Sequence, residues 1–216
     1  MIDFFLTTYN RKEITKRCIQ NLNKIKIKRY GSFHIHDDCS DEYDFKWLNK
    51  FKPNKVSVSE HIGIDRIMLQ RIAQFKRQDE FEYFYSLDND MIHDPSFVTK
   101  ALELYEKYKL PLTLYNTKYH NKNIIRENSE VYVLKSFPGA SIFFHKKDVV
   151  NIKDYRILGN GNRGWDWHMG ILWKKTFICP KTSYCDHYGE EGMHNCSDDI
   201  AENPTEFLLE ERTKIK

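Results

Sequence analysis

The sequence has no long apolar run, few and scattered cysteines, and almost no excess charge, and each shortage excludes a class of protein. No stretch of the 216 residues approaches the roughly 18 apolar residues that suggest a membrane span. The five cysteines lack Cys-x-x-Cys spacing, which argues against a zinc site and favours free thiols in a reducing compartment. A net charge of +3 gives no support for a general nucleic-acid binder.

Targeting signals, repeats and low-complexity linkers are missing as well. The apolar run at residues 2–6 is short and has no basic flank, so it does not read as a signal peptide. We therefore expect a cytoplasmic protein with no transmembrane segment. The length and a hydrophobic content of 40% predict one domain over residues 1–197, followed by a solvated tail at residues 198–216.

Apolar segments with strand and helix periods alternate through residues 1–90. Strands are predicted at residues 2–8, 32–37, 55–59 and 81–87, with helical patterns between them. Such alternation favours right-handed crossovers and a mostly parallel sheet covered by helices. Later strand-like segments at 112–115, 131–134 and 141–144 are separated only by loops, so they are expected to add mixed or antiparallel strands.

The aromatic strand at residues 81–87 ends on Asp88-Asn89-Asp90. Two carboxylates separated by one residue can hold one hard divalent cation. Asp94 and Pro95 then predict that a helix begins at once. This order is expected where a bound metal meets a diphosphate at the carboxyl end of a sheet. The alternative is an acidic turn that caps a helix.

Polar residues also end the first two predicted strands, as Thr7-Thr8-Tyr9-Asn10-Arg11 and as Asp37-Asp38. In a parallel sheet these ends share one edge with the Asp-x-Asp pair. A tyrosine can stack on a base, and a carboxylate can accept a hydrogen bond from a base N–H. The edge therefore has the parts needed to bind a nucleoside diphosphate without a glycine-rich loop.

These motifs, together with Trp165-Asp166-Trp167, resemble the family-2 type of glycosyltransferase with the GT-A fold, over residues 3–190. Residues 139–147 resemble the family's segment that leads to the acceptor side. The resemblance implies a mixed, mostly parallel central sheet flanked by helices, with a nucleotide-binding half at 1–95 and an acceptor-binding half at 96–197. It also implies metal-dependent transfer from a sugar nucleotide, UDP-sugar by default, to a hydroxyl of a glycan or another acceptor.

The resemblance also assigns donor-binding residues. Thr7 and Tyr9 would line the base pocket, and Asp38 would contact the base. Arg66 would be a basic donor contact. The alternatives from the residues themselves are a core aromatic for Tyr9, a turn-forming aspartate for Asp38, and a solvated helix residue for Arg66.

The metal would lie between Asp88, which is also near the ribose or sugar, and Asp90, the firmer ligand. His187 would complete the shell, with His194 as a competing ligand. Imidazole suits manganese better than magnesium, so Mn²⁺ is expected, with Mg²⁺ as the second possibility.

Asp166 is the candidate general base of an inverting transfer, because such a transfer needs a carboxylate beside the acceptor hydroxyl. Trp165 or Trp167 would stack on a sugar ring. Many relatives have two adjacent acids at this place, so Glu190 or Glu191 could substitute as the base. Otherwise Asp166 caps a helix and the tryptophans belong to the core.

One rival function remains open, a non-catalytic nucleotide- or sugar-binding module with the same fold. A nucleotidylyltransferase is disfavoured, because this chain has no glycine-rich, basic loop after its first strand.

Overall fold

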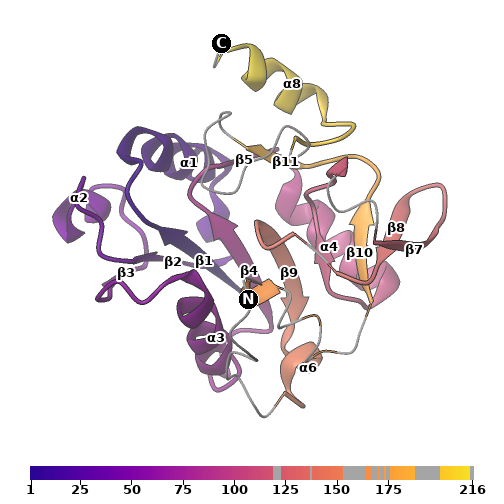
Figure 1. Ribbon diagram of the computed structural model, residues 1–216, viewed down its shortest axis with the longest axis horizontal. Coiled ribbons are helices and arrows are strands. Elements are labelled where there is room, and N and C mark those ends of the chain that lie inside the picture. The colour runs from indigo at the N-terminus through magenta and orange to yellow at the C-terminus, as the bar shows by residue number, and fades with distance from the viewer. Residues whose placement is uncertain are drawn as a thin grey trace.

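The computed structural model describes residues 1–118, 123–136, 138–152, 164–166, 170, 173, 176–187 and 200–214. Helices alternate with strands in its first half, and strands dominate its second half (Figure 1). The strands of the described part are β1 (Ile2–Thr8), β2 (Gly31–Asp37), β3 (Lys55–Val58), β4 (Tyr83–Asp88), β5 (Met91–His93), β6 (Leu112–Thr113), β7 (Ile124–Glu127), β8 (Val131–Leu134), β9 (Ser141–His145), β10 (Phe177–Pro180) and β11 (Cys185–His187). The helices are α1 (Lys12–Ile25), the 3₁₀ turn η1 (Ile27–Arg29), α2 (Phe45–Asn49), α3 (Ile64–Phe75), α4 (Phe97–Tyr108), α6 (Lys146–Val149) and α8 (Glu206–Thr213).

Within these residues a nine-stranded sheet has the order β3-β2-β1-β4-β9-β6-β10-β8-β7. Strands β3, β2, β1 and β4 are parallel, which confirms the predicted βα alternation. Strand β9 is antiparallel to β4, and β8 is antiparallel to both β10 and β7. The predicted mixed α/β fold is therefore confirmed. A separate pairing of β5 with β11 was not predicted from the sequence.

The two faces of the sheet carry two core clusters, and β1 contributes to both because its side chains alternate. Phe4 and Leu6 pack in the cluster that includes side chains from α1 and α4. Phe5 packs in the cluster that includes side chains from α3. Phe84 stacks on Phe144 in this second cluster, with ring centroids 5.0 Å apart. Each such fully buried aromatic stabilises the fold by roughly 1.5–3 kcal/mol.

A buried ion pair also fastens α3 to the sheet. Arg71 on α3 donates to the carboxylate of Asp3 on β1, and their side chains are only 6% and 1% exposed. Burial is the main cause that raises the pKa of Asp3, and the guanidinium of Arg71 opposes it. The helix that precedes β4 is therefore held in place by charge as well as by apolar packing.

Two local predictions were wrong. The helix after the Asp-x-Asp motif begins at Phe97, because residues 91–93 first form β5 and Asp94 accepts hydrogen bonds in the following turn. Residues 200–214 are not a solvated tail, since Leu208 is fully buried and Ala201 bridges to Thr117. In Figure 1 α8 lies next to the β5–β11 pair, and its Leu208 clusters with Ile92 of β5. No helix in the described ranges is both long enough and apolar enough to cross a membrane.

Candidate active site

The predicted strand ends meet at one rim of the sheet. Strand β1 lies between β2 and β4, and Thr7 is in register with both His36 and Asp88. Thr8 donates through Oγ1 to Asp37 Oδ1 at 2.9 Å, which joins the ends of β1 and β2. Thr7 itself is buried at this rim. The first half of the chain therefore brings its polar strand ends together as the sequence predicted.

The Asp-x-Asp motif is held by its central residue. Asn89 Nδ2 donates to Thr15 Oγ1 on α1 at 2.7 Å, and a longer contact of 3.5 Å reaches the carbonyl of Asn10. This amide ties the turn after β4 to the start of α1. It leaves Asp88 and Asp90 on either side of a fixed residue.

Asp90 has two basic neighbours from distant parts of the chain. Arg11 Nη1 lies 2.8 Å from Asp90 Oδ2, and His187 Nδ1 lies 3.5 Å from Asp90 Oδ1. Arg11 reaches this position from a left-handed backbone conformation, with φ 61°, immediately before α1. The ring of His187 also meets the ring of Tyr115 edge to face, with centroids 5.0 Å apart. The structure thus places His187 beside Asp90, and its role as a metal ligand stays a prediction.

The two carboxyl groups have opposite pKa shifts. Burial raises the pKa of Asp88 to about 7, and the negative charge of Asp90 adds to this rise. Burial also acts to raise the pKa of Asp90, but the hydrogen bonds and charges of His187 and Arg11 outweigh it and lower that pKa to about 2. Such a divergence is typical of two like charges that share one small site. A cation placed between them would relieve the repulsion.

The side chains fit a divalent cation in chemistry. Carboxylate oxygens and one imidazole form a donor set that manganese accepts. Among the described residues, however, no three histidine, cysteine or acidic side chains are already gathered as a metal cage. The guanidinium of Arg11 contacts the carboxylate that was predicted to be the firmer ligand. Metal binding at Asp90 would therefore compete with this ion pair.

Asp166 lies beside Gly139, in the segment that leads into β9. A Cβ atom on Gly139 would lie 3.7 Å from the Asp166 carboxyl carbon and 3.4 Å from Trp165 Nε1, at van der Waals contact with both side chains. The charge of Asp166 also contributes to the raised pKa of Asp88. Asp166 therefore lies within electrostatic range of the Asp-x-Asp motif.

Trp165 does not fit its predicted role. Its side chain is only 5% exposed and packs in the core cluster on the α3 face. Its backbone N–H donates to Asp65 Oδ1 at 2.6 Å, which fastens this segment to the first turn of α3. A ring buried in this way has little surface for a sugar to stack on. We conclude that the Trp165 ring belongs to this core cluster.

Tyr9 and Asp38 lie at the opposite side, beside the loop of residues 59–63. Tyr9 is 39% exposed, and its ring faces that of His61 with centroids 4.7 Å apart. Asp38 is 5% exposed and accepts hydrogen bonds from the backbone N–H groups of Ile62 and Gly63, at 2.9 and 3.0 Å. Asp38 thus holds this loop in place, and its contact with a base stays a prediction.

Arg66 is exposed on α3 and forms no ion pair with another residue of the described part. Its predicted donor contact stays a prediction. The alternative base residues Glu190 and Glu191, the alternative ligand His194 and the second tryptophan, Trp167, lie outside the described residues.

Sequence reasoning assigned no role to three residues of this rim. Arg11 contacts Asp90 and His61 contacts Tyr9, whereas Asn89 fixes the turn between Asp88 and Asp90 through Thr15. Arg11 and Asn89 stand inside the motifs already recognised, so their positions were a usable signal. His61 had none, because only the fold brings its loop to the end of β1.

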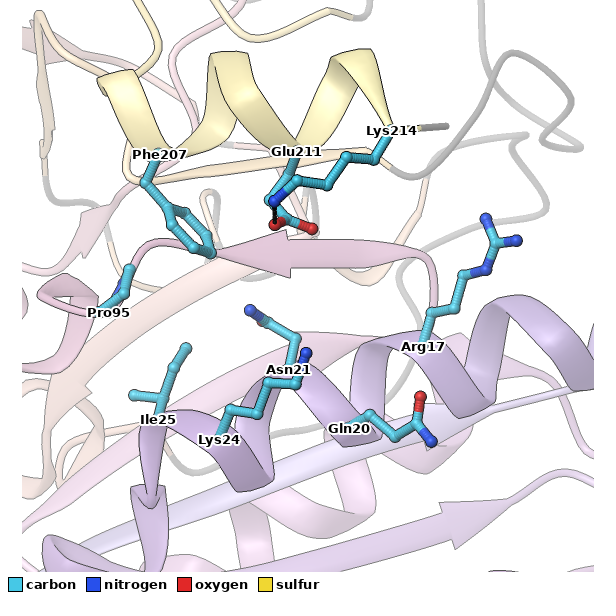
Figure 2. Close-up of a pocket in the computed structure, with 9 residues that line it drawn as sticks. All are labelled: Arg17, Gln20, Asn21, Lys24, Ile25, Pro95, Phe207, Glu211 and Lys214. Carbon is cyan, nitrogen blue, oxygen red and sulfur yellow. Dashed lines mark hydrogen bonds and ion pairs between the residues drawn. The ribbon is translucent and has the colours of Figure 1, made fainter. Parts of the chain in front are cut away.

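A surface groove of about 310 Å³ lies elsewhere, between α1 and α8 (Figure 2). Its lining shares no residue with the predicted site and consists of Arg17, Gln20, Asn21, Lys24, Ile25, Pro95, Phe207, Glu211 and Lys214.

Solved structures resemble this fold at low sequence identity. S. aureus TarS 1-349 in complex with UDP-GlcNAc superposes with a TM-score of 0.63 at 14% identity, over 89% of this chain and 60% of that one. GalNAc-T7 with UDP, GalNAc and Mn²⁺ gives 0.60 at 9% identity, over 83% and 41%. A197 from STIV gives 0.55 at 13% identity, over 94% of both chains. No family model and no curated protein matches the chain by sequence.

The chain therefore has the GT-A-type glycosyltransferase fold, as the resemblance implied. Among these neighbours, TarS and GalNAc-T7 are glycosyltransferases with UDP ligands. The chain spans only 59% of the length of TarS 1-349, so it corresponds to part of that structure.

Proposed function

We propose that this chain is a metal-dependent glycosyltransferase that moves a sugar from a nucleotide-diphosphate sugar to an acceptor hydroxyl. The observation that carries the proposal is the meeting of Tyr9, Asp38 and Asp88-Asn89-Asp90 at one rim, with Asp166 in electrostatic range. UDP-sugar is the proposed donor, because TarS and GalNAc-T7 were solved with UDP-GlcNAc and with UDP. The proposed halves are residues 1–95 for the nucleotide and 96–197 for the acceptor.

In this proposal the exposed ring of Tyr9 stacks on the base, and Asp38 with Thr7 closes the pocket around it. Asp88, Asp90 and His187 would hold Mn²⁺ or Mg²⁺. When bound, such a cation stabilises the charge that develops on the leaving diphosphate. Arg11, if the cation displaced it from Asp90, would be a second positive charge available to the diphosphate.

On the acceptor side, Asp166 takes the proton of the attacking hydroxyl as the new glycosidic oxygen–carbon bond forms. The chain at Gly139 runs beside this carboxylate and beside Trp165. Attack from the face opposite the leaving diphosphate inverts the configuration at the transferred carbon. The products are the glycosylated acceptor and the nucleoside diphosphate.

Donor binding is tested by calorimetry with UDP, in the presence and absence of Mn²⁺. We expect Mn²⁺ to tighten UDP binding, and we expect Asp90→Asn to remove this effect. Asp79→Asn is a matched control, since Asp79 is exposed and precedes β4, at the other end of the strand from the motif. If UDP binds the protein neither with nor without Mn²⁺, the proposed donor is wrong.

Turnover is tested by the release of UDP from a panel of UDP-sugars. Loss of release in Asp88→Asn and Asp90→Asn, with Asp79→Asn unaffected, would support an enzyme. Tight UDP binding without release from any donor would instead indicate the non-catalytic binding module. Asp166→Asn should bind UDP normally and lose transfer, and a folded Asp166→Asn variant with full transfer would overturn the assignment of the base.

A further inference from the structure

The carboxyl-terminal helix is tied to the site by one ion pair. Arg212 on α8 donates through Nε to Asp186 Oδ2, on the strand β11 that ends at His187. The Asp186 side chain is only 3% exposed. Its other oxygen, Oδ1, accepts the backbone N–H groups of His187 at 3.0 Å and Ala201 at 3.1 Å. Arg212 Nη2 also donates to the carbonyl of Ala201 at 2.9 Å. One guanidinium and one carboxylate therefore bind three backbone groups on two residues, His187 and Ala201.

The Arg212–Asp186 pair is next to the proposed metal ligand His187, because Asp186 precedes His187 on β11. In the pairing of β11 with β5, Asp186 is opposite Ile92 and His187 is opposite Met91. Met91 follows Asp90 in the chain, so this register brings His187 to the Asp-x-Asp turn. The carboxylate of Asp186 accepts the hydrogen bond from the backbone N–H of His187. The position of the imidazole thus depends on where Asp186 is fixed.

Helix α8 reaches Asp186 because it is docked on other elements. Leu208 is fully buried and clusters with Ile92 on β5 and Ile14 on α1. Thr205 Oγ1, at the start of the helix, donates to Asp94 Oδ2 at 2.6 Å. Phe207 points from α8 toward Pro95 and α1 in the groove of Figure 2. Apolar contacts and a hydrogen bond therefore hold α8 in place before Arg212 is considered.

We propose that Arg212 is a positioning residue, which fixes His187 beside Asp90 by holding the buried carboxylate of Asp186. This inference rests on the proposed function of His187 as a metal ligand. A buried carboxylate that loses the cation paired with it is strongly destabilised, so β11 would shift to expose Asp186 to water. Partners that orient a metal ligand from behind typically change metal affinity by about 10- to 100-fold when they are removed.

The test measures binding of Mn²⁺ alone to the full chain by calorimetry, together with the NMR signal of the His187 ring in the metal-free protein. Arg212→Met should weaken Mn²⁺ binding by about 10- to 100-fold and shift the His187 signal. Arg212→Lys keeps the charge but cannot bind the Asp186 carboxylate and the Ala201 carbonyl through separate nitrogens, as Arg212 does. It should therefore restore Mn²⁺ binding only in part. Lys214→Met is the matched control, because Lys214 is 61% exposed on the same helix and pairs with Glu211.

The outcomes separate the two proposals. If wild type binds Mn²⁺ and the Arg212 variants bind it equally well with an unchanged His187 signal, Arg212 has no positioning role and the proposed function stands. If wild type does not bind Mn²⁺, the metal-dependent function fails, and an unshifted His187 signal in Arg212→Met then overturns the positioning role as well. An equal loss of binding in Lys214→Met would also overturn it, because removal of any charge from α8 would then suffice.

Discussion

His93 on β5 is a buried imidazole without a polar partner, and this makes stability sensitive to acid. Its side chain is fully buried, and neither ring nitrogen has a hydrogen-bond partner in the described part of the chain. The ring packs against Phe97 with centroids 4.6 Å apart, and more loosely against Tyr85. Burial in these apolar surroundings lowers the pKa of His93 to about 3.

The sign of the effect follows from proton linkage. In the unfolded chain a histidine titrates at its ordinary pKa of 6.5, whereas in the native state His93 stays neutral down to about pH 3. The unfolded state therefore binds a proton first, and stability is lost as the pH falls below 6.5 until it reaches the native pKa. One pKa unit corresponds to about 1.4 kcal/mol, so at about pH 5 this single histidine lowers the free energy of unfolding by about 2 kcal/mol.

The assay is urea unfolding at about pH 7.5 and about pH 5, for wild type and for His93→Leu. Leucine fills similar space without an ionisable group, so the loss of stability between the two pH values should shrink by about 2 kcal/mol. His34, whose pKa burial also lowers to about 3, remains in both proteins and cancels in the comparison.

Ile92→Val is the matched control, because Ile92 is the buried neighbour of His93 on β5. It should lower stability by about 0.5–1.5 kcal/mol at both pH values alike. If His93→Leu loses as much stability on acidification as wild type does, the reasoning about His93 is refuted.

Three further changes test the fold and the rim. Arg71→Met leaves Asp3 as a buried charge without its cation, and should lower the urea-unfolding free energy by about 3–5 kcal/mol; a loss below about 1 kcal/mol would show that the pair is weak. Tyr9→Ala removes the exposed ring, and calorimetry should show UDP affinity reduced by the 1–3 kcal/mol that one base stack contributes. Gly139→Val pushes against Trp165 and Asp166, so the turnover number should fall by up to about 10²-fold while UDP affinity is unchanged; equal loss of both would contradict a role confined to the acceptor side.

The parallel half of the fold was predictable because its signals are local. Strand β1 is buried along its length and has a continuous apolar centre at Phe4, Phe5 and Leu6, since both of its faces are covered by helices, and α1 and α3 show a clear apolar stripe. The polar residues after β1, β2 and β4 then had to meet, because parallel neighbours end on one edge. The placement of Asp88 and Asp90 near Tyr9 needed no knowledge of the second half.

The second half was harder because its contacts are short and distant in the chain. Strands β5 and β11 have three residues each, too few to show a period, and about ninety residues separate them. Helix α8 has a weak apolar face, and its one fully buried side chain, Leu208, resembles any leucine of a solvated helix. Trp165 carries no sequence mark that distinguishes a core ring from a sugar platform.

The sequence by itself determined the order of strands and helices in the first half and the kinds of side chain at the rim, because alternation and turn chemistry act between neighbours in the chain. Only the tertiary structure decided which charges meet and which aromatic ring is buried. Arg11 contacts Asp90, Arg212 holds Asp186 behind His187, and Trp165 is buried. These pairings depend on how separate segments pack in space, and an ion pair between residues far apart in the chain leaves no local pattern by which it could be recognised.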